Sequence, residues 1–108
     1  VKDFRIISTG YNGFIRGAPH ISIVRDNHEQ NTIHSEQNAI AFASRRGSSI
    51  EGSEIYITHF PCINCTKFII ASGIIKIYYL HDYKNDDLCL ELLKLANICI
   101  TKIDKDNI

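Results

Sequence analysis

The sequence has no long hydrophobic run, no excess of charge of either sign, and no repeat or low-complexity segment. No stretch approaches the roughly 18 consecutive apolar residues that suggest a membrane-spanning helix. The first residues, 1–5, do not have the composition of a signal peptide. These absences favour a cytoplasmic protein with no membrane partner.

The charge and composition of the chain indicate which kind of molecule it binds. Twelve basic residues balance twelve acidic residues, so the formal net charge is zero. A chain without a broad positive field does not favour a long polyanion such as DNA or tRNA. A small-molecule substrate is therefore favoured. With 108 residues, 44% of them hydrophobic and 22% charged, the chain is expected to form a single globular domain, 1–108.

The sequence contains four cysteines, which a reducing compartment keeps as thiols or metal ligands. Cys62 and Cys65 form a Cys-x-x-Cys pair. Cys89 and Cys99 lie inside apolar patterns, where a free cysteine is usually a small core residue. The first pair is therefore the candidate for chemistry, and the other two are expected in the core.

Strand and helix patterns alternate along the second half of the chain, which predicts an α/β domain with a central sheet. A turn at residues 2–5 implies a preceding strand that this sequence does not contain, so the domain is expected to be N-terminally incomplete. Residues 14–31 show no period and are expected to form a long loop. The predicted strands are 5–9, 54–60, 74–80 and 98–103. The predicted helices are 35–46, one that has Pro61 in its first turn and runs to about residue 72, and one capped by Asp86 or Asp87.

Two short motifs carry the chemistry. His34-Ser35-Glu36 is followed later in the chain by Pro61-Cys62-Ile63-Asn64-Cys65, and together they match the signature of zinc nucleobase deaminases. One imidazole and two thiolates fill three corners of a tetrahedral zinc site and leave the fourth corner open, as in catalytic sites. We therefore expect His34, Cys62 and Cys65 to bind one catalytic Zn²⁺.

Glu36 is the predicted catalytic residue, because it lies two positions from a ligand and is not itself a ligand. Its carboxylate is suited to taking a proton from the attacking water and delivering it to the substrate. A lone Cys-x-x-Cys is often a structural zinc site or a redox pair, but a redox role leaves His34 and Glu36 unused. His59 is a candidate fourth ligand, with packing or a place in the site wall as the favoured alternative.

A longer resemblance covers most of the chain. Residues 9–13, 32–40, 55–67 and 77–83 resemble deoxycytidylate (dCMP) deaminases, especially the bacterial branch encoded with competence genes. The resemblance implies a three-layer α/β/α cytidine-deaminase-like fold with a central mixed sheet, whose opening helix and first strand are missing here. It also implies hydrolysis of dCMP to dUMP and ammonia, which supplies dUMP for thymidylate synthesis. A hexameric homo-oligomer and the effectors dCTP and dTTP are further implications.

The same resemblance suggests substrate contacts. Asn12 is expected to contact the sugar hydroxyl, although an asparagine in a glycine-flanked turn has a plain alternative as a turn former. Phe60 and Tyr83 are expected to stack on the base or to line the pocket mouth, with core packing as the competing interpretation. Arg16 and Lys67 are candidates for the 5′-phosphate, although each such residue is more often a solvated surface charge.

Two residues of the motifs complete the expected substrate site. Ser35 stands where the family usually has Ala, and its backbone N–H is expected to face the pyrimidine carbonyl. Pro61, which precedes the first cysteine ligand, is also expected among the substrate-binding residues. The change from Ala to Ser is expected to have little effect.

The competence-linked branch also carries a second, structural zinc ion. His20 and His28 fall at two of its ligand positions, but Ile21 and Glu29 stand where cysteines would be needed. We therefore expect the catalytic ion alone.

Two other functions compete with the dCMP deaminase hypothesis. A tRNA adenosine deaminase shares both motifs, but the neutral charge and the Gly-Tyr-Asn-Gly turn argue against it. A non-catalytic, zinc-stabilised module is the second alternative, and the presence of Glu36 argues against it, because a structural zinc site needs no proton carrier.

Overall fold

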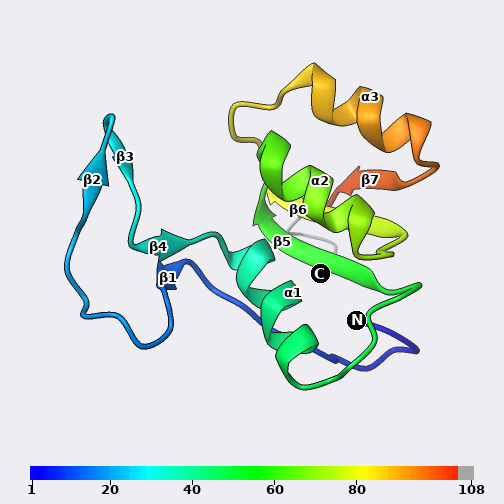
Figure 1. Cartoon of the computed structure of the whole chain (residues 1–108). Helices are drawn as coiled ribbons and strands as arrows, with labels where there is room; N and C mark the ends of the chain where they lie inside the picture. Colours follow the sequence, from blue (N-terminus) through cyan, green and yellow to red (C-terminus); the bar gives the residue numbers. More distant parts are fainter. Residues whose placement is uncertain (105–108) are drawn as a thin grey trace.

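A parallel three-stranded sheet, with helices in the crossovers between its strands, forms the centre of the structure (Figure 1). In this computed structural model, which describes residues 1–104, the strand order is β5-β6-β7. Parallel neighbours need crossover connections, and α2 and α3 supply them. The predicted α/β class is confirmed. The bounds are α1 Ser35–Arg45, β5 Glu54–His59, α2 Ile63–Ala71, β6 Lys76–His81, α3 Asp87–Leu95 and β7 Cys99–Lys102.

One apolar cluster ties the sheet to all three described helices. Its buried members are Ile69 of α2, Ile77 of β6, Leu93 of α3, and Ile74. Ile40 of α1 packs against this cluster, so the helix with the His-x-Glu motif shares the same core. Burying one such aliphatic side chain stabilises a fold by roughly 1.5–3 kcal/mol. The core therefore fixes α1 and α2 relative to each other and to β5.

The two cysteines predicted for the core differ in burial. Cys89 of α3 is fully buried, as predicted, whereas Cys99 of β7 is exposed. Ile98 and Ile100 pack against the apolar cluster, and side chains alternate between the faces of a strand. Cys99 therefore points to the opposite face, and its assignment to the core is wrong.

The helices begin and end close to the predicted residues. The Asp86 side chain accepts a hydrogen bond from the Leu88 N–H at 2.9 Å and caps α3. Gly47 and Gly73 follow α1 and α2 with φ of 70° and 84°, the left-handed conformation expected after a helix. Pro61 lies just before the N-cap Cys62 and not inside the first turn. No helix within residues 1–104 is long and apolar enough to cross a membrane.

The N-terminal segment differs from its prediction. The turn at residues 2–5 is confirmed, with φ of 52° at Asp3 and 63° at Phe4. Residues 5–9 do not form the predicted strand, because no neighbouring strand pairs with them in the described part of the chain. The segment runs along α1 instead, where the Ser8 hydroxyl donates to the Ala39 carbonyl at 2.7 Å.

The predicted loop 14–31 contains more structure than expected. Strands β2 (Val24–Arg25) and β3 (His28–Glu29) form a hairpin that projects away from the rest of the chain (left of Figure 1). Its turn residues, Asp26 and Asn27, both have positive φ, as a two-residue hairpin turn requires. At the base of the loop, β1 (Gly13–Phe14) pairs antiparallel with β4 (Thr32–Ile33). The prediction of an unstructured loop is thus wrong at its tip.

The Glu29 side chain stabilises this loop through hydrogen bonds. Its carboxylate accepts hydrogen bonds from the N–H groups of Ile23 and Asn31, each at 3.0 Å, and from the Ser22 hydroxyl. The hydrogen bond from the Ser22 hydroxyl, followed by those from the Ile23 and Asn31 N–H groups, stabilises the charged form and lowers the pKa of Glu29 below its usual value. At this position, where the resemblance expects a cysteine, the side chain organises the loop through hydrogen bonds.

The outer edge of β5 is largely unpaired within residues 1–104. Val1 is the exception. Its amino group donates a hydrogen bond to the Glu54 carbonyl, and the Glu54 N–H donates one to the Val1 carbonyl, both at 2.7 Å. Beside this pair, a cavity of about 500 Å³ lies between residues 6–12 and β5.

We predict that Gly10→Ala destabilises the protein. An added Cβ would lie 2.4 Å from the Ser35 carbonyl oxygen and 2.5 Å from the Ala39 nitrogen, both backbone atoms. Overpacking of this kind costs about 1–3 kcal/mol, which chemical denaturation followed by circular dichroism would measure. Gly13→Ala is the matched control, since its Cβ would meet only the exposed Tyr11 ring. An unchanged midpoint for Gly10→Ala would contradict this contact.

Candidate metal centre and active site

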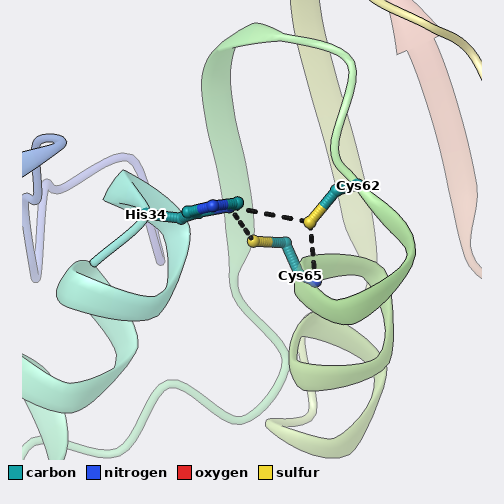
Figure 2. Close-up of side chains that lie close together, drawn as sticks. All are labelled: His34, Cys62 and Cys65. Atoms are coloured by element: carbon teal, nitrogen blue, oxygen red, sulfur yellow. Dashed lines mark hydrogen bonds between the residues drawn. The ribbon is translucent and has the colours of Figure 1, made fainter. Parts of the chain in front are cut away.

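The N-terminal ends of α1 and α2 meet at one point and bring together the three predicted metal ligands (Figure 2). His34 is the N-cap of α1 and Cys62 is the N-cap of α2, while Cys65 lies in the first turn of α2. The His34 Nδ1 atom lies 3.2 Å from the Cys65 Sγ atom and 3.6 Å from the Cys62 Sγ atom. Residues far apart in the sequence therefore form one cluster.

The donor set fits zinc. Zn–S bonds of about 2.3 Å and Zn–N bonds of about 2.0–2.1 Å at tetrahedral angles place nitrogen and sulfur about 3.5 Å apart. The two N···S distances, 3.2 and 3.6 Å, bracket this value. Within residues 1–104, this cluster is the one group of three such side chains close enough to hold a metal ion. With three protein ligands, a fourth position is left for water or substrate.

The two thiols have different surroundings. Cys65 is fully buried, and burial, followed by the charges of Glu36 and Cys62, raises the pKa of its thiol above the ordinary value. Cys62 accepts a hydrogen bond from the Cys65 N–H at 3.4 Å, at the positive end of the α2 dipole. A divalent cation would supply the positive charge that the buried Cys65 thiolate lacks.

Glu36 lies in the first turn of α1, next to the metal ligands. Its Oε1 atom accepts a hydrogen bond from the Ser35 hydroxyl at 2.6 Å. This bond holds the carboxylate at the site, so Ser35 takes part through its side chain. From the sequence, only the backbone N–H of Ser35 was expected to take part.

A cavity of about 330 Å³ opens beside the cluster. Its volume lies in the usual range of small-molecule sites, about 300–1,000 Å³. Phe60 is buried and packs edge-on against Tyr79, whereas Tyr83 is more than half exposed. The cavity is lined by Asn12, His34, Ser35, Glu36, Thr58, His59, Phe60, Cys62 and Tyr83.

Most of the predicted substrate-contact residues are therefore gathered at this cavity. Arg16 and Pro61 are not among its lining residues, and neither is Lys67. Pro61 is buried, and its carbonyl accepts a long hydrogen bond from the Cys89 thiol. The assignment of Arg16 and Pro61 to substrate binding stays a prediction. Thr58 lines the cavity although sequence reasoning missed it; its place near the carboxyl end of the predicted strand was the available signal.

Asn12 anchors the start of α1. Its Oδ1 atom accepts a hydrogen bond from the Ser35 N–H at 2.7 Å, while the N-cap His34 makes no side-chain cap bond. The Asn38 side chain donates to the Tyr11 carbonyl at 3.0 Å and reinforces this junction. The Ser35 N–H, which was expected to face the substrate, is therefore already engaged in this structure. Asn12 keeps its Nδ2 donor for a ligand.

We predict that Asn12→Ala destabilises the protein by about 0.5–2 kcal/mol, the usual cost of losing a side-chain helix cap. Asn12→Asp is the control, since it keeps an acceptor oxygen for the Ser35 N–H. Thermal unfolding followed by circular dichroism would compare the two variants. Equal melting temperatures for Asn12→Ala and the unaltered protein would show that this hydrogen bond does not hold α1 in place.

Comparison with known proteins agrees with this site. Residues 1–81 match the family described as cytidine and deoxycytidylate deaminase zinc-binding region. The chain is 42% identical over 110 residues to the "ComE operon protein 2" of Bacillus subtilis (strain 168), covering 98% of this chain and 58% of that protein. It is 41% identical over 96 residues to the deoxycytidylate deaminase of Enterobacteria phage T4, covering 88% and 50%.

A solved structure of a dCMP deaminase has a similar fold. The dCMP deaminase of cyanophage S-TIM5, in complex with dCMP and dUMP, superposes with a TM-score of 0.82 at 31% identity. The match covers 95% of this chain and 76% of that one. The chain spans 50–58% of the length of the two curated relatives named above. Together with the family match and the geometry of the metal cluster, these similarities show that the chain belongs to the cytidine and deoxycytidylate deaminase family.

Proposed function

We propose that the protein hydrolyses dCMP to dUMP and ammonia. The observation that carries this proposal is the placement of Glu36 and the His34, Cys62 and Cys65 cluster at one cavity with a volume in the range of small-molecule sites. The choice of dCMP as the substrate is supported by two similar proteins. The phage T4 relative is a deoxycytidylate deaminase, and the S-TIM5 structure holds dCMP and dUMP.

The reaction replaces the exocyclic amine of the pyrimidine with oxygen from water. His34, Cys62 and Cys65 would hold a zinc ion, which would make water available as a nucleophile at neutral pH by lowering its pKa from about 15.7 toward about 7. Glu36 would accept one proton from the attacking water and pass it to the ring nitrogen beside the carbon under attack. It would then carry the remaining hydroxyl proton to the amine, which leaves as ammonia. The Ser35 hydroxyl keeps the Glu36 carboxylate in position through its 2.6 Å hydrogen bond.

The other lining residues would orient the substrate. Asn12 offers its Nδ2 donor to the sugar hydroxyl, because its Oδ1 atom is engaged with Ser35. Phe60 and Tyr83 offer aromatic surface to the base or to the mouth of the cavity. These contacts would hold the reacting carbon near the metal cluster, and such positioning accounts for a large part of enzymatic rate enhancement.

The resemblance in sequence suggests the wider role. We propose that the product dUMP supplies thymidylate synthesis in the cytoplasm, that the protein is a hexameric homo-oligomer, and that dCTP and dTTP act as effectors. One catalytic Zn²⁺ suffices for the chemistry proposed here.

Ammonia release from a panel of substrates tests the proposed function. We predict release from dCMP, and little or none from deoxycytidine, CMP, dCTP or an anticodon stem-loop RNA, when the zinc-loaded protein is assayed with a glutamate dehydrogenase coupled reaction. Activity on the RNA alone would replace the proposal with tRNA adenosine deamination. Bound zinc without activity on any of these substrates would favour a structural zinc module.

Substitution of Glu36 separates the metal site from the proton carrier. We predict that Glu36→Gln keeps zinc but lowers kcat for dCMP by at least about 10²–10⁴-fold, because general acid–base catalysis contributes that much. His34→Ala and Cys62→Ala are expected to lose both zinc and turnover. Metal content by plasma mass spectrometry and turnover on the same samples would check both. Near-normal turnover by Glu36→Gln would rule out its role.

A further inference from the structure

The cavity offers few cations for a nucleotide phosphate. A 5′-phosphate carries negative charge and is usually bound by charged or N–H donors. The basic side chains among the lining residues are His34 and His59. His34 faces the two cysteine sulfurs and belongs to the metal cluster. Arg16 and Lys67, the cations suggested by the sequence, are outside the lining.

His59 is held at the sheet edge where ligands of α/β proteins usually bind. It is the last residue of β5 and pairs in register with His81, the last residue of β6. Both strands are parallel, so these residues share the carboxyl edge of the sheet. Their ring centroids lie 5.3 Å apart, and the Tyr83 ring meets the His59 ring edge-on at 5.9 Å.

The His59 ring has one nitrogen engaged and one available. Its Nδ1 atom lies 3.0 Å from the Thr58 hydroxyl oxygen. The Nε2 atom makes no hydrogen bond to any other residue of the described range 1–104. When the Thr58 hydroxyl donates to Nδ1, the proton of the neutral ring lies on Nε2, which is then a donor toward a ligand.

We propose that His59 binds the 5′-phosphate of the substrate through its Nε2 atom and thereby makes the protein select nucleotides over nucleosides. The inference rests on the proposed deamination of dCMP and adds the residue that recognises the phosphate. Thr58 orients the ring through its hydroxyl, and the His81 and Tyr83 rings restrict its movement. His59 thus serves as a specificity-determining residue, separate from the metal ligands.

The test compares dCMP with deoxycytidine, which lacks only the phosphate. In the zinc-loaded protein, His59→Gln should lower kcat/KM for dCMP by about 10- to 100-fold, the effect expected for losing a hydrogen bond to a charged group. The loss should appear mainly as a rise in KM for dCMP. The preference for dCMP over deoxycytidine, measured as the ratio of the two kcat/KM values at high enzyme concentration, should therefore fall. Lys94→Gln, which removes a cation in the last turn of α3, is the control and should leave both values unchanged.

Two further variants make the outcome decisive. His59→Arg supplies an N–H donor at the same position and should recover part of the preference for dCMP, whereas His59→Ala should not. Isothermal titration with dUMP and with deoxyuridine gives the same comparison without turnover: His59→Gln should weaken only dUMP. Zinc content and circular dichroism confirm that each variant is folded.

The possible results separate this inference from the proposed function. If the unaltered protein does not deaminate dCMP, the proposed function and this inference both fail. If it does, and the His59 variants keep the preference for dCMP, the proposed function stands and His59 is not the phosphate ligand. A loss of preference in Arg16→Gln or Lys67→Gln, with none in His59→Gln, would assign the phosphate to those residues.

Discussion

The meeting of two helix starts around one set of metal ligands is the constraint on which the rest of the site depends. The ligand atoms of His34, Cys62 and Cys65 lie within 4.8 Å of one another although they come from two helices. The core fixes these helices, because Ile40 of α1 and Ile69 of α2 belong to the same apolar packing. The free N–H groups at helix starts favour negative charge, so the place suits thiolates and a carboxylate.

A chain of hydrogen bonds then links structure to chemistry. Asn12 accepts from the Ser35 backbone, and the Ser35 hydroxyl donates to Glu36, at 2.7 and 2.6 Å. One serine therefore joins the residue that anchors α1 to the residue proposed to carry protons. The turn that holds Asn12 is itself pressed against α1, where Gly10 leaves no room for a side chain. The position of Glu36 thus depends on a segment far from it in sequence.

The sequence predicted the elements whose signals are local, and it failed where pairing or exposure depends on distant residues. The caps at Asp86, Gly47 and Gly73 are local, and those helix ends were correct. Residues 5–9 have the composition of a strand, but a strand also needs a partner, which the described chain does not offer. The metal ligands were predictable because zinc requires fixed residue types. The lining role of Thr58 and the occupied N–H of Ser35 were not, because they follow from how β5 and residue 12 meet α1.

The charge state of the two cysteines in the cluster depends on a bound metal ion. Burial raises the pKa of the Cys65 thiol, so without a cation this residue holds its proton at neutral pH. Metal binding requires the thiolate and therefore releases that proton, which makes the affinity for metal rise with pH. Glu36 adds negative charge beside Cys65 and further disfavours an anionic, metal-free site. A divalent cation relieves this repulsion, so the arrangement that suits catalysis is also the one that most needs the ion to be present.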